Sequence, residues 1–248
     1  DCIWGLVKNG NTTIGGRAGF PVFRACGGLL AIHWFWGLST MIWSRYRINY
    51  IYLFDFNPKV VATPTSIFNN AVDETVVFLV CMLLYYKASA HDMPDFIAPG
   101  YFPFLLVIYT LYKLVVPWST RGPLWSHIIS CLTAPLTSPT FFDTYVGDVF
   151  TSMVKIFQDM AWTICFIASG DFLISEDTDG IELRNWHTTF WYKKVLIPVI
   201  CLFPLVIRFN QCLRKFMDTG EHWPNMANAF KYAMSQTVTL FGAFEPLY

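Results

Sequence analysis

The stretch DVFTSMVKIFQDMAWTICFIAS, residues 148–169, decides the fold because it sets four polar side chains inside a very apolar part of the chain. At about 100° per residue, Asp148, Ser152, Lys155 and Asp159 project within an arc of roughly 60° on a helix. The other positions are mostly apolar. The pattern therefore predicts one long helix, over about residues 145–169, with a single polar stripe.

The composition is that of a membrane protein. Of 248 residues, 54% are hydrophobic and only 14% are charged, whereas soluble domains carry about 25% charged residues. Seventeen basic residues balance seventeen acidic ones, so no general attraction to nucleic acid is predicted. The expected surroundings are a lipid bilayer.

About six segments are apolar over roughly the 20 residues that cross a bilayer. They are residues 20–43, 66–86, 97–118, 145–169, 190–209 and 225–244, with a hydrophilic loop at 169–189. Residues 124–136 are too short for a span and are expected to be interfacial or re-entrant. The fold class expected is all-α, a polytopic transmembrane helical bundle. Residues 1–19 form an N-terminal flank, and residues 20–248 form one membrane domain that is a fragment of a larger one.

Ionised side chains inside a membrane need partners, because each costs at least about 2.5–3.5 kcal/mol at the centre of the bilayer. Asp148 and Asp159 are roughly 16 Å apart along a straight helix, which fits two levels of one polar pathway. Lys155 lies one turn from Asp159. The alternative is therefore an intrahelical ion pair that packs the bundle and transports nothing.

A second polar cluster lies in residues 207–235, IRFNQCLRKFMDTGEHWPNMANAFKYAMS. Arg208 and Lys215 are seven residues apart at the end of an apolar helix, where their N–H groups suit a phosphate or carboxylate. Lys231 returns inside the next apolar segment. We predict functional roles for Arg208 and Lys231, whereas Arg214 is equally well explained as a side chain that reaches the membrane interface.

No pattern predicts an enzyme, a cofactor or a metal centre. The five histidines lack metal-ligand spacing, and the seven cysteines, which show no paired spacing, are expected to be free thiols. Neither a nucleophile elbow nor a phosphate-binding loop of the P-loop type occurs. The stretch FDFNPK, residues 54–59, favours a turn at Asn57. Alternatively, Asn57 presents an oxygen acceptor at the mouth of a pore.

Four stretches in the same order resemble the EXS domain family. They are FRACGGLLAIHWFWGLSTMIW (23–43), FDFNP (54–58), CLTAPLTSPTFFDTYVGDVFTSMVKIFQDMAWTICF (131–166) and RFNQCLRKFMDTGEHWPNMANAFKY (208–232). The family includes plant and fungal phosphate exporters, an animal phosphate exporter that is also the xenotropic and polytropic retrovirus receptor, and a yeast Golgi protein. The resemblance covers most of residues 20–235.

The resemblance implies a polytopic helical protein that exports inorganic phosphate along a polar path, in the plasma membrane or in Golgi and other endomembranes. It implies that the path is lined by Asp148, Ser152 and Asp159, with Asp143 at its approach. It also implies that Arg208, Arg214 and Lys215 bind or guide phosphate, with support from Lys231. The alternative function is that of the Golgi members, protein retention or trafficking without direct transport.

The chain departs from the family pattern at two of these positions. Asn57 stands where many relatives have an acidic residue, which puts the contribution of that loop to a pore mouth in doubt. Lys215 stands where an arginine is common, so a bidentate fork is lost. The SPX module, which senses inositol pyrophosphates in family exporters, is not in this sequence; it lies elsewhere in the full protein or is missing, as in the Golgi members. A homodimer is left open.

Overall fold

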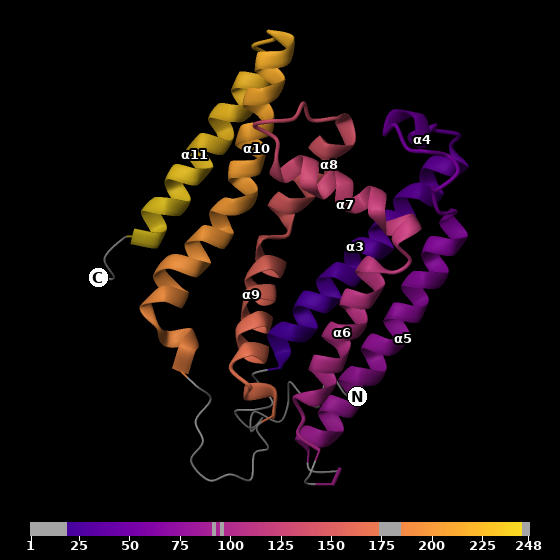
Figure 1. The fold of residues 1–248 in the computed structure, drawn as a ribbon, viewed down its shortest axis with the longest axis vertical. Helices are drawn as coiled ribbons and strands as arrows, with labels where there is room; N and C mark the ends of the chain where they lie inside the picture. The colour runs from indigo at the N-terminus through magenta and orange to yellow at the C-terminus, as the bar shows by residue number, and fades with distance from the viewer. Residues whose placement is uncertain (1–18, 91–92, 95–96, 174–184, 245–248) are drawn as a thin grey trace. The chain divides into compact units, whose positions relative to one another are not determined.

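A computed structural model describes residues 19–90, 93–94, 97–173 and 185–244, and within them every regular element is helical (Figure 1). The α-helices are α3 (Phe20–Arg45), α4 (Tyr50–Leu53), α5 (Pro64–Ser89), α6 (Tyr101–Val115), α7 (Trp118–Leu132), α8 (Phe141–Ser152), α9 (Val154–Ala168), α10 (Ile197–Thr219) and α11 (Asn225–Phe244). Short 3₁₀ turns lie at Asp171–Leu173 and Asn185–Thr188, and a π-helical segment, Trp191–Leu196, leads directly into α10. The predicted all-α class is confirmed. The predicted flank, apart from Gly19, and the centre of the hydrophilic loop, residues 174–184, lie outside the described residues.

Local sequence sets where the helices begin and end. The side chain of Thr63 caps α5 by accepting a hydrogen bond from Ser66 N, and Pro64 occupies the first helical position, where its missing N–H costs nothing. At the other end of the chain, α10 stops at Gly220, whose φ of 70° lies in the left-handed region that glycine adopts without strain.

The single helix predicted over residues 145–169 is wrong, because the structure breaks it at Met153. The hydroxyl of Thr151 donates to the carbonyl oxygen of Asp148 at 2.7 Å, and that of Ser152 reaches the same oxygen at 3.4 Å. Such side chains compete with the backbone for its acceptors and favour helix ends. The expected stripe is therefore divided: Asp148 and Ser152 lie on α8, whereas Lys155 and Asp159 lie on α9.

Three helical segments are long and apolar enough to cross a membrane: α3, α5 and the continuous stretch Trp191–Thr219. Helices α6 and α7 form a bent pair, either a broken span or a re-entrant loop, which makes four at most within the described residues. This pair covers the predicted span at 97–118 and most of the segment expected to be interfacial or re-entrant. By length and composition the predicted count of about six is therefore higher than the structure supports. The break at Met153 shortens one candidate, and α11 has the expected bounds but is less apolar.

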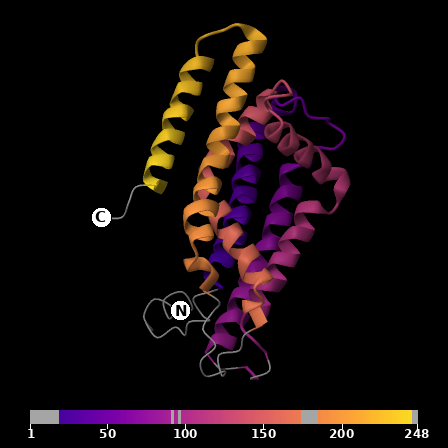
Figure 2. The same cartoon turned by 60° about the vertical axis from the view of Figure 1, so that its left-hand side comes forward.

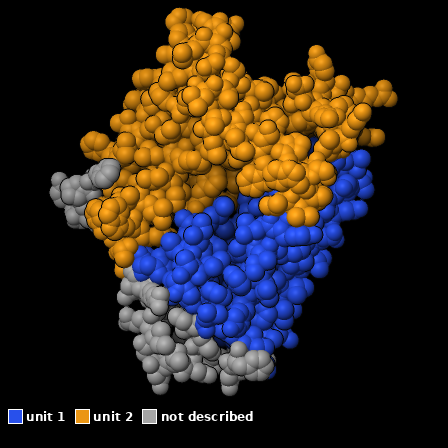
Figure 3. Space-filling view, in the orientation of Figure 1, with its two compact units in different colours: residues 1–42, 62–114, 159–187 blue, residues 43–61, 115–158, 188–248 orange. Residues whose placement is uncertain are grey.

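The chain forms two compact units (Figure 3). Unit 1 consists of residues 1–42, 62–114 and 159–187, and unit 2 of residues 43–61, 115–158 and 188–248. Most of α3, α5, α6 and α9 belongs to unit 1, whereas α4, α7, α8, α10 and α11 belong to unit 2. Asp148 and Asp159 therefore lie in different units.

Unit 1 packs around side chains from three helices that run side by side (Figures 1 and 2). Phe23 and Cys26 of α3, Tyr85 of α5 and Leu106 of α6 form one buried cluster. Val22 packs against Phe166 of α9 in a second cluster. Burial of these apolar groups holds the four helices together.

Unit 2 is built on the hairpin of α10 and α11, which lie side by side in both ribbon views (Figures 1 and 2). Cys212, Ala229 and Tyr232 form its buried cluster. A cluster of aromatic side chains packs the loop after α4 against α8. The ring centroid of Phe142 lies 5.2 Å from that of Phe54 and 4.7 Å from that of Phe56.

Large apolar side chains stay exposed along the spanning helices. On α5, for example, Val76 is 55% exposed, Leu79 56% and Leu83 43%. Rows of such side chains on a helix with few charges match a helix whose outer face meets lipid, since burying them in water-free surroundings is favourable.

We predict that Gly100→Ala destabilises unit 1 by about 1–3 kcal/mol, the usual cost of overpacking. A Cβ at Gly100 would lie 2.3 Å from the carbonyl oxygen of Phe172 and 2.6 Å from its Cα, and these backbone atoms cannot rotate away. Thermal unfolding of the purified protein in detergent measures the effect.

Gly242→Ala is the matched control, because a Cβ there has nothing within 4 Å. In helix α11 that change should be neutral or stabilising by up to about 1 kcal/mol. Equal unfolding temperatures for the two variants would show that α6 and the segment at Phe172 do not approach as described.

Candidate anion-binding site

Arg208 lies on the apolar helix α10, is buried, and binds partners from three helices. Its Nε lies 2.8 Å from Asp148 Oδ1 of α8 and 3.2 Å from the hydroxyl of Tyr232 of α11. Its Nη1 donates to Gln211 Oε1 at 2.7 Å. A cation inside an apolar helix needs such partners. The predicted residues Asp148 and Arg208 are therefore brought together by the fold.

The close approach of α8 to α10 depends on Gly147. A Cβ at this position would lie 2.5 Å from Gln211 Oε1 and 2.7 Å from Arg208 Cδ. Only glycine leaves that volume free. The residue before Asp148 therefore admits the guanidinium that Asp148 binds.

Gln211 connects this ion pair to the start of α8. Its side chain is fully buried, and its Nε2 donates to the backbone oxygen of Asp143 at 2.9 Å and approaches Cys131 Sγ at 3.4 Å. A buried amide with both ends bonded has one orientation. Arg208 is thereby held by a side chain that is itself fixed.

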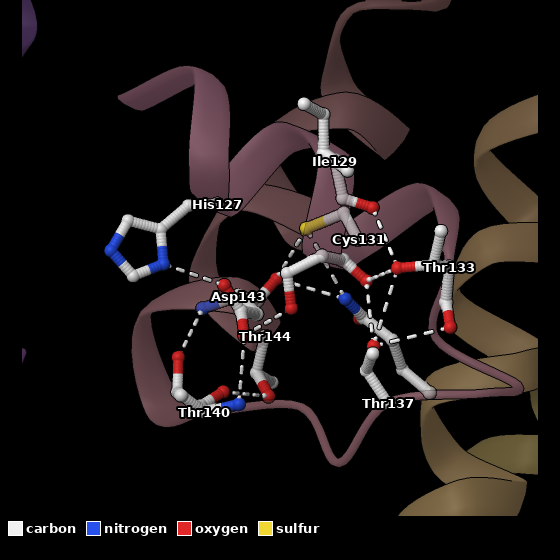
Figure 4. A network of polar contacts seen from close by, with 10 residues as sticks. His127, Ile129, Cys131, Thr133, Thr137, Thr140, Asp143 and Thr144 are labelled. Carbon is white, nitrogen blue, oxygen red and sulfur yellow. Dashed lines mark hydrogen bonds and ion pairs between the residues drawn. The ribbon is translucent and has the colours of Figure 1, made fainter. Parts of the chain in front are cut away.

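Asp143 is the N3 residue of a capping box that starts α8 (Figure 4). Its Oδ2 accepts hydrogen bonds from Thr140 N and from Ser130 Oγ, both at 2.9 Å, and Oδ1 lies 2.7 Å from His127 Nδ1. Burial raises the pKa of this carboxyl, but the hydrogen bonds from Thr140, His127 and Ser130 outweigh burial and hold the pKa below its ordinary value. Asp143 therefore stays ionised and supports α8 from inside.

Charged groups gather around the thiol of Cys212. This thiol lies within electrostatic reach of four charged side chains, those of Arg208, Lys215, Lys231 and Asp148. Three cations and one carboxylate leave two excess positive charges. Within the described part of the chain neither lysine has an ion-pair partner, and Lys231 Nζ lies 4.4 Å from the ring centroid of Tyr232. We call Arg208, Lys215 and Lys231 the basic cluster.

Arg208 keeps a donor for a ligand. Its bonds come from Nε and Nη1, whereas Nη2 makes no hydrogen bond to any described residue. Asp148 is 54% exposed and is therefore the solvent-facing member of the ion pair. The arrangement can bind an anion with several oxygens.

Arg214 does not join the basic cluster. It forms an ion pair with Asp218, one turn away, at 3.0 Å between Nε and Oδ1, and its Nη2 reaches Ser138 Oγ at 3.4 Å. Its charge is balanced locally, as expected for a side chain at the membrane interface.

The remaining predicted residues of unit 2 are exposed. Asn57 closes a turn, with its Oδ1 accepting from Lys59 N at 3.1 Å, so the turn predicted there is confirmed. Ser152 donates to the backbone of its own helix, and Lys155 is exposed on the first turn of α9.

Asp159 belongs to unit 1 and binds Arg24 of α3, a residue that the sequence reasoning missed. The pair is bidentate, 2.9 Å from Nε to Oδ2 and 2.8 Å from Nη2 to Oδ1. The carboxylate is only 4% exposed, whereas the guanidinium is 53% exposed. The sequence did indicate that Arg24 needs a partner, because this cation lies inside a predicted span.

The family model for EXS matches residues 19–248, which is nearly the whole chain. The chain belongs to the EXS family. It is 28% identical to SPX and EXS domain-containing protein 1 of Dictyostelium discoideum, over 92% of this chain and 24% of that protein. It is 24% identical to solute carrier family 53 member 1 of Homo sapiens, over 92% of this chain and 33% of that protein. It is 28% identical to the xenotropic and polytropic retrovirus receptor 1 homolog of Danio rerio, over 90% of this chain and 33% of that protein. The chain thus spans about a quarter to a third of the length of these relatives.

Membership in the EXS family confirms the resemblance and the membrane location. Together with three helices able to cross a bilayer, it makes this chain part of an integral membrane protein. The structure adds a physical reason for one stretch of the resemblance, RFNQC at 208–212: Arg208 and Gln211 bond each other, and Cys212 lies among the charges.

The lowered pKa of Asp143 predicts how stability depends on pH. Because the ionised form is favoured in the folded state, its contribution is present above about pH 4, the usual range of a free aspartate, and is lost as pH falls through the lower pKa of the folded protein. Asp143→Asn should cost about 1–3 kcal/mol at pH 7 and flatten the acid limb of the curve. Thermal unfolding in detergent from pH 7 to pH 3 measures both effects.

Asp55→Asn serves as the control for Asp143→Asn, since Asp55 is exposed and asparagine tolerates its φ of 55°. It should leave the curve unchanged. An acid limb that is equally steep in Asp143→Asn and in the wild type would contradict the capping network.

A double-mutant cycle tests the Arg24–Asp159 pair. Arg24→Gln removes the bidentate partner of a buried carboxylate, and we expect a cost of about 3 kcal/mol. Asp159→Asn should cost less, because the Arg24 side chain is half exposed. The double variant should be more stable than the sum of the single effects by at least about 1 kcal/mol, measured by unfolding in detergent. Additive effects would mean that the two side chains do not interact.

Proposed function

We propose that this chain belongs to the membrane domain of an inorganic phosphate exporter and that the basic cluster is its phosphate-binding site. The observation that carries the proposal is Arg208, a buried cation on an apolar helix. Its Nη2 bonds no described residue, and it lies beside two lysines that have no ion-pair partner in the described part of the chain. Membership in the EXS family and relatives named as solute carriers support a transport role rather than catalysis.

The chemistry of the cluster suits phosphate. A guanidinium offers several N–H groups in one plane to the oxygens of phosphate, and the ammonium groups of Lys215 and Lys231 add charge without fixing geometry. Two excess positive charges complement a multiply charged oxyanion. Tyr232, whose hydroxyl reaches both Arg208 and Asp148, places a further polar group beside it.

Asp148 gives the site a means of release. When no anion is bound, its carboxylate neutralises Arg208; phosphate entering the site replaces the carboxylate, and the carboxylate returns when phosphate leaves. Transport requires binding that is strong enough for entry and weak enough for exit. An internal competitor at 2.8 Å meets that requirement.

The other predicted path residues take different places in this proposal. Asp143 supports the site through Gln211, and Arg214 lies at the membrane interface with its charge balanced by Asp218. Ser152, Lys155, Asp159 and Asn57 are kept as members of the predicted path.

The proposed partners are phosphate and the surrounding lipid. We also propose that the full protein carries an SPX module, which is supported by the name of the Dictyostelium relative that the chain matches over 24% of its length. The homodimer is kept as a prediction.

Removing the guanidinium should reduce transport. We predict that Arg208→Ala lowers phosphate efflux from proteoliposomes containing the full-length protein by about tenfold or more, since charge-assisted hydrogen bonds contribute about 1.5–3 kcal/mol. Arg208→Lys should retain part of the activity. Lys231→Gln, at an exposed position, should raise the phosphate concentration for half-maximal efflux while protein abundance stays the same.

Arg45→Ala is the control, because Arg45 is exposed at the end of α3 and does not belong to the basic cluster. It should transport as the wild type does. Efflux that is unchanged in Arg208→Ala and Lys231→Gln would reject the site. Absence of efflux in the wild type would favour a retention or trafficking role.

A further inference from the structure

A histidine and a glutamate meet between two spanning helices of unit 1. His33 Nδ1 of α3 lies 2.9 Å from Glu74 Oε2 of α5. The two side chains are only 14% and 17% exposed. Neither residue belongs to the basic cluster, and the proposed phosphate site does not use them.

Trp34 and Thr75, the next residue on each helix, form a second contact that stabilises the first. Trp34 Nε1 donates to Thr75 Oγ1 at 3.0 Å, and the Thr75 hydroxyl donates in turn to the backbone oxygen of Ala71 at 2.6 Å. Two adjacent pairs of side chains therefore fix the register of α3 against α5. The imidazole and the carboxylate are held at bonding distance by the helices, not by their own attraction alone.

The other titratable and charged groups near the pair lie on α5 and α6. On α5, Asp73 is an exposed neighbour of Glu74. From α6, Tyr109 lies within the electrostatic reach of Glu74 and Asp73, and Lys113 donates to Asn70 at 3.1 Å.

The charged residue of α3 that is nearest to His33 in the sequence is Arg24. It forms an ion pair with Asp159 of α9. Arg24 precedes His33 by nine residues, about 14 Å along the helix. A proton on His33 is therefore the nearest charge able to balance Glu74.

The protonation state of this pair decides its charge inside the membrane. With a proton on the imidazole, the pair is imidazolium and carboxylate, and its net charge is zero. Releasing that proton to water leaves a neutral imidazole beside a carboxylate, a net charge of minus one between two apolar helices. Histidine is the side chain whose ordinary pKa lies where such a step occurs near neutral pH. Ionisable groups within membrane-spanning helices are costly and mark sites of function.

We propose that His33 and Glu74 form a proton-binding site, and that its occupancy controls the rate of phosphate transport. The control of transport rests on the proposed function, whereas proton binding does not. One proton is taken up from water by the imidazole and returned to water.

Proton binding is tested on the purified full-length protein by infrared difference spectroscopy between pH 5.5 and pH 8.5. The wild type should show an imidazole titration coupled to a carboxylate band. His33→Gln should remove both signals, because its amide still donates to Glu74 but does not titrate, and Glu74→Gln should remove the carboxylate signal. The control His222→Gln, at an exposed histidine in the turn between α10 and α11, should leave both signals in place.

Transport is measured in proteoliposomes over the same pH range with phosphate as the probe. Because protonation changes the charge of the pair from minus one to zero, flux should change severalfold across this pH range in the wild type. It should change less than about twofold in His33→Gln and Glu74→Gln. The exchanged variant His33→Glu with Glu74→His rebuilds the pair and should restore the pH dependence.

The outcomes separate this inference from the proposed function. Titration signals that persist unchanged in His33→Gln and Glu74→Gln would overturn the proton site, even where phosphate flux depends on Arg208. Flux that is absent at every pH, with both signals lost in His33→Gln and the carboxylate signal lost in Glu74→Gln, would leave the proton site standing, overturn its control of transport and reject phosphate export.

Discussion

A guanidinium inside an apolar helix has to be matched by partners, and in unit 2 the packing follows from how Arg208 is matched. Asp148 brings α8 to α10, Tyr232 brings α11, and Gln211 connects the arginine to the backbone of Asp143. Gly147 leaves the space that this requires. One buried charge thus determines which helices meet. The Nη2 of the same guanidinium, which bonds no described residue, makes the place where they meet suitable for an anion.

The same constraint applies in unit 1, where the charges are arranged differently. Asp159 is the buried member of its pair and Arg24 the exposed one, which reverses the pattern of Asp148 and Arg208. Each carboxylate of the predicted stripe therefore has its own arginine, in its own unit. In both units an arginine meets the carboxylate from a different helix. The lysines of the basic cluster, in contrast to Arg208, have no ion-pair partner within the described residues.

The sequence was sufficient to predict the helical class and three of the spans, because these follow from apolar length. The functional role of Arg208, inferred from the cost of charge in a membrane, stays a prediction. The sequence was not sufficient for the break at Met153, which depends on which carbonyl oxygen the hydroxyls of Thr151 and Ser152 choose. It also did not reveal that Arg24 meets Asp159, since the two residues are 135 positions apart and only the fold brings them together. Arg214 and Lys215 are adjacent in the sequence, yet only the structure shows that Asp218 balances the first.

The most direct test of the account is an electron cryomicroscopy map of the full-length protein, recorded with and without inorganic phosphate at a saturating concentration. The account predicts oxyanion density within hydrogen-bonding distance of the Arg208 guanidinium, next to Lys231, with the Asp148 carboxylate displaced from Arg208 only in the phosphate-bound map. Phosphate density elsewhere in the protein, with the Asp148–Arg208 ion pair intact in both maps, would contradict it.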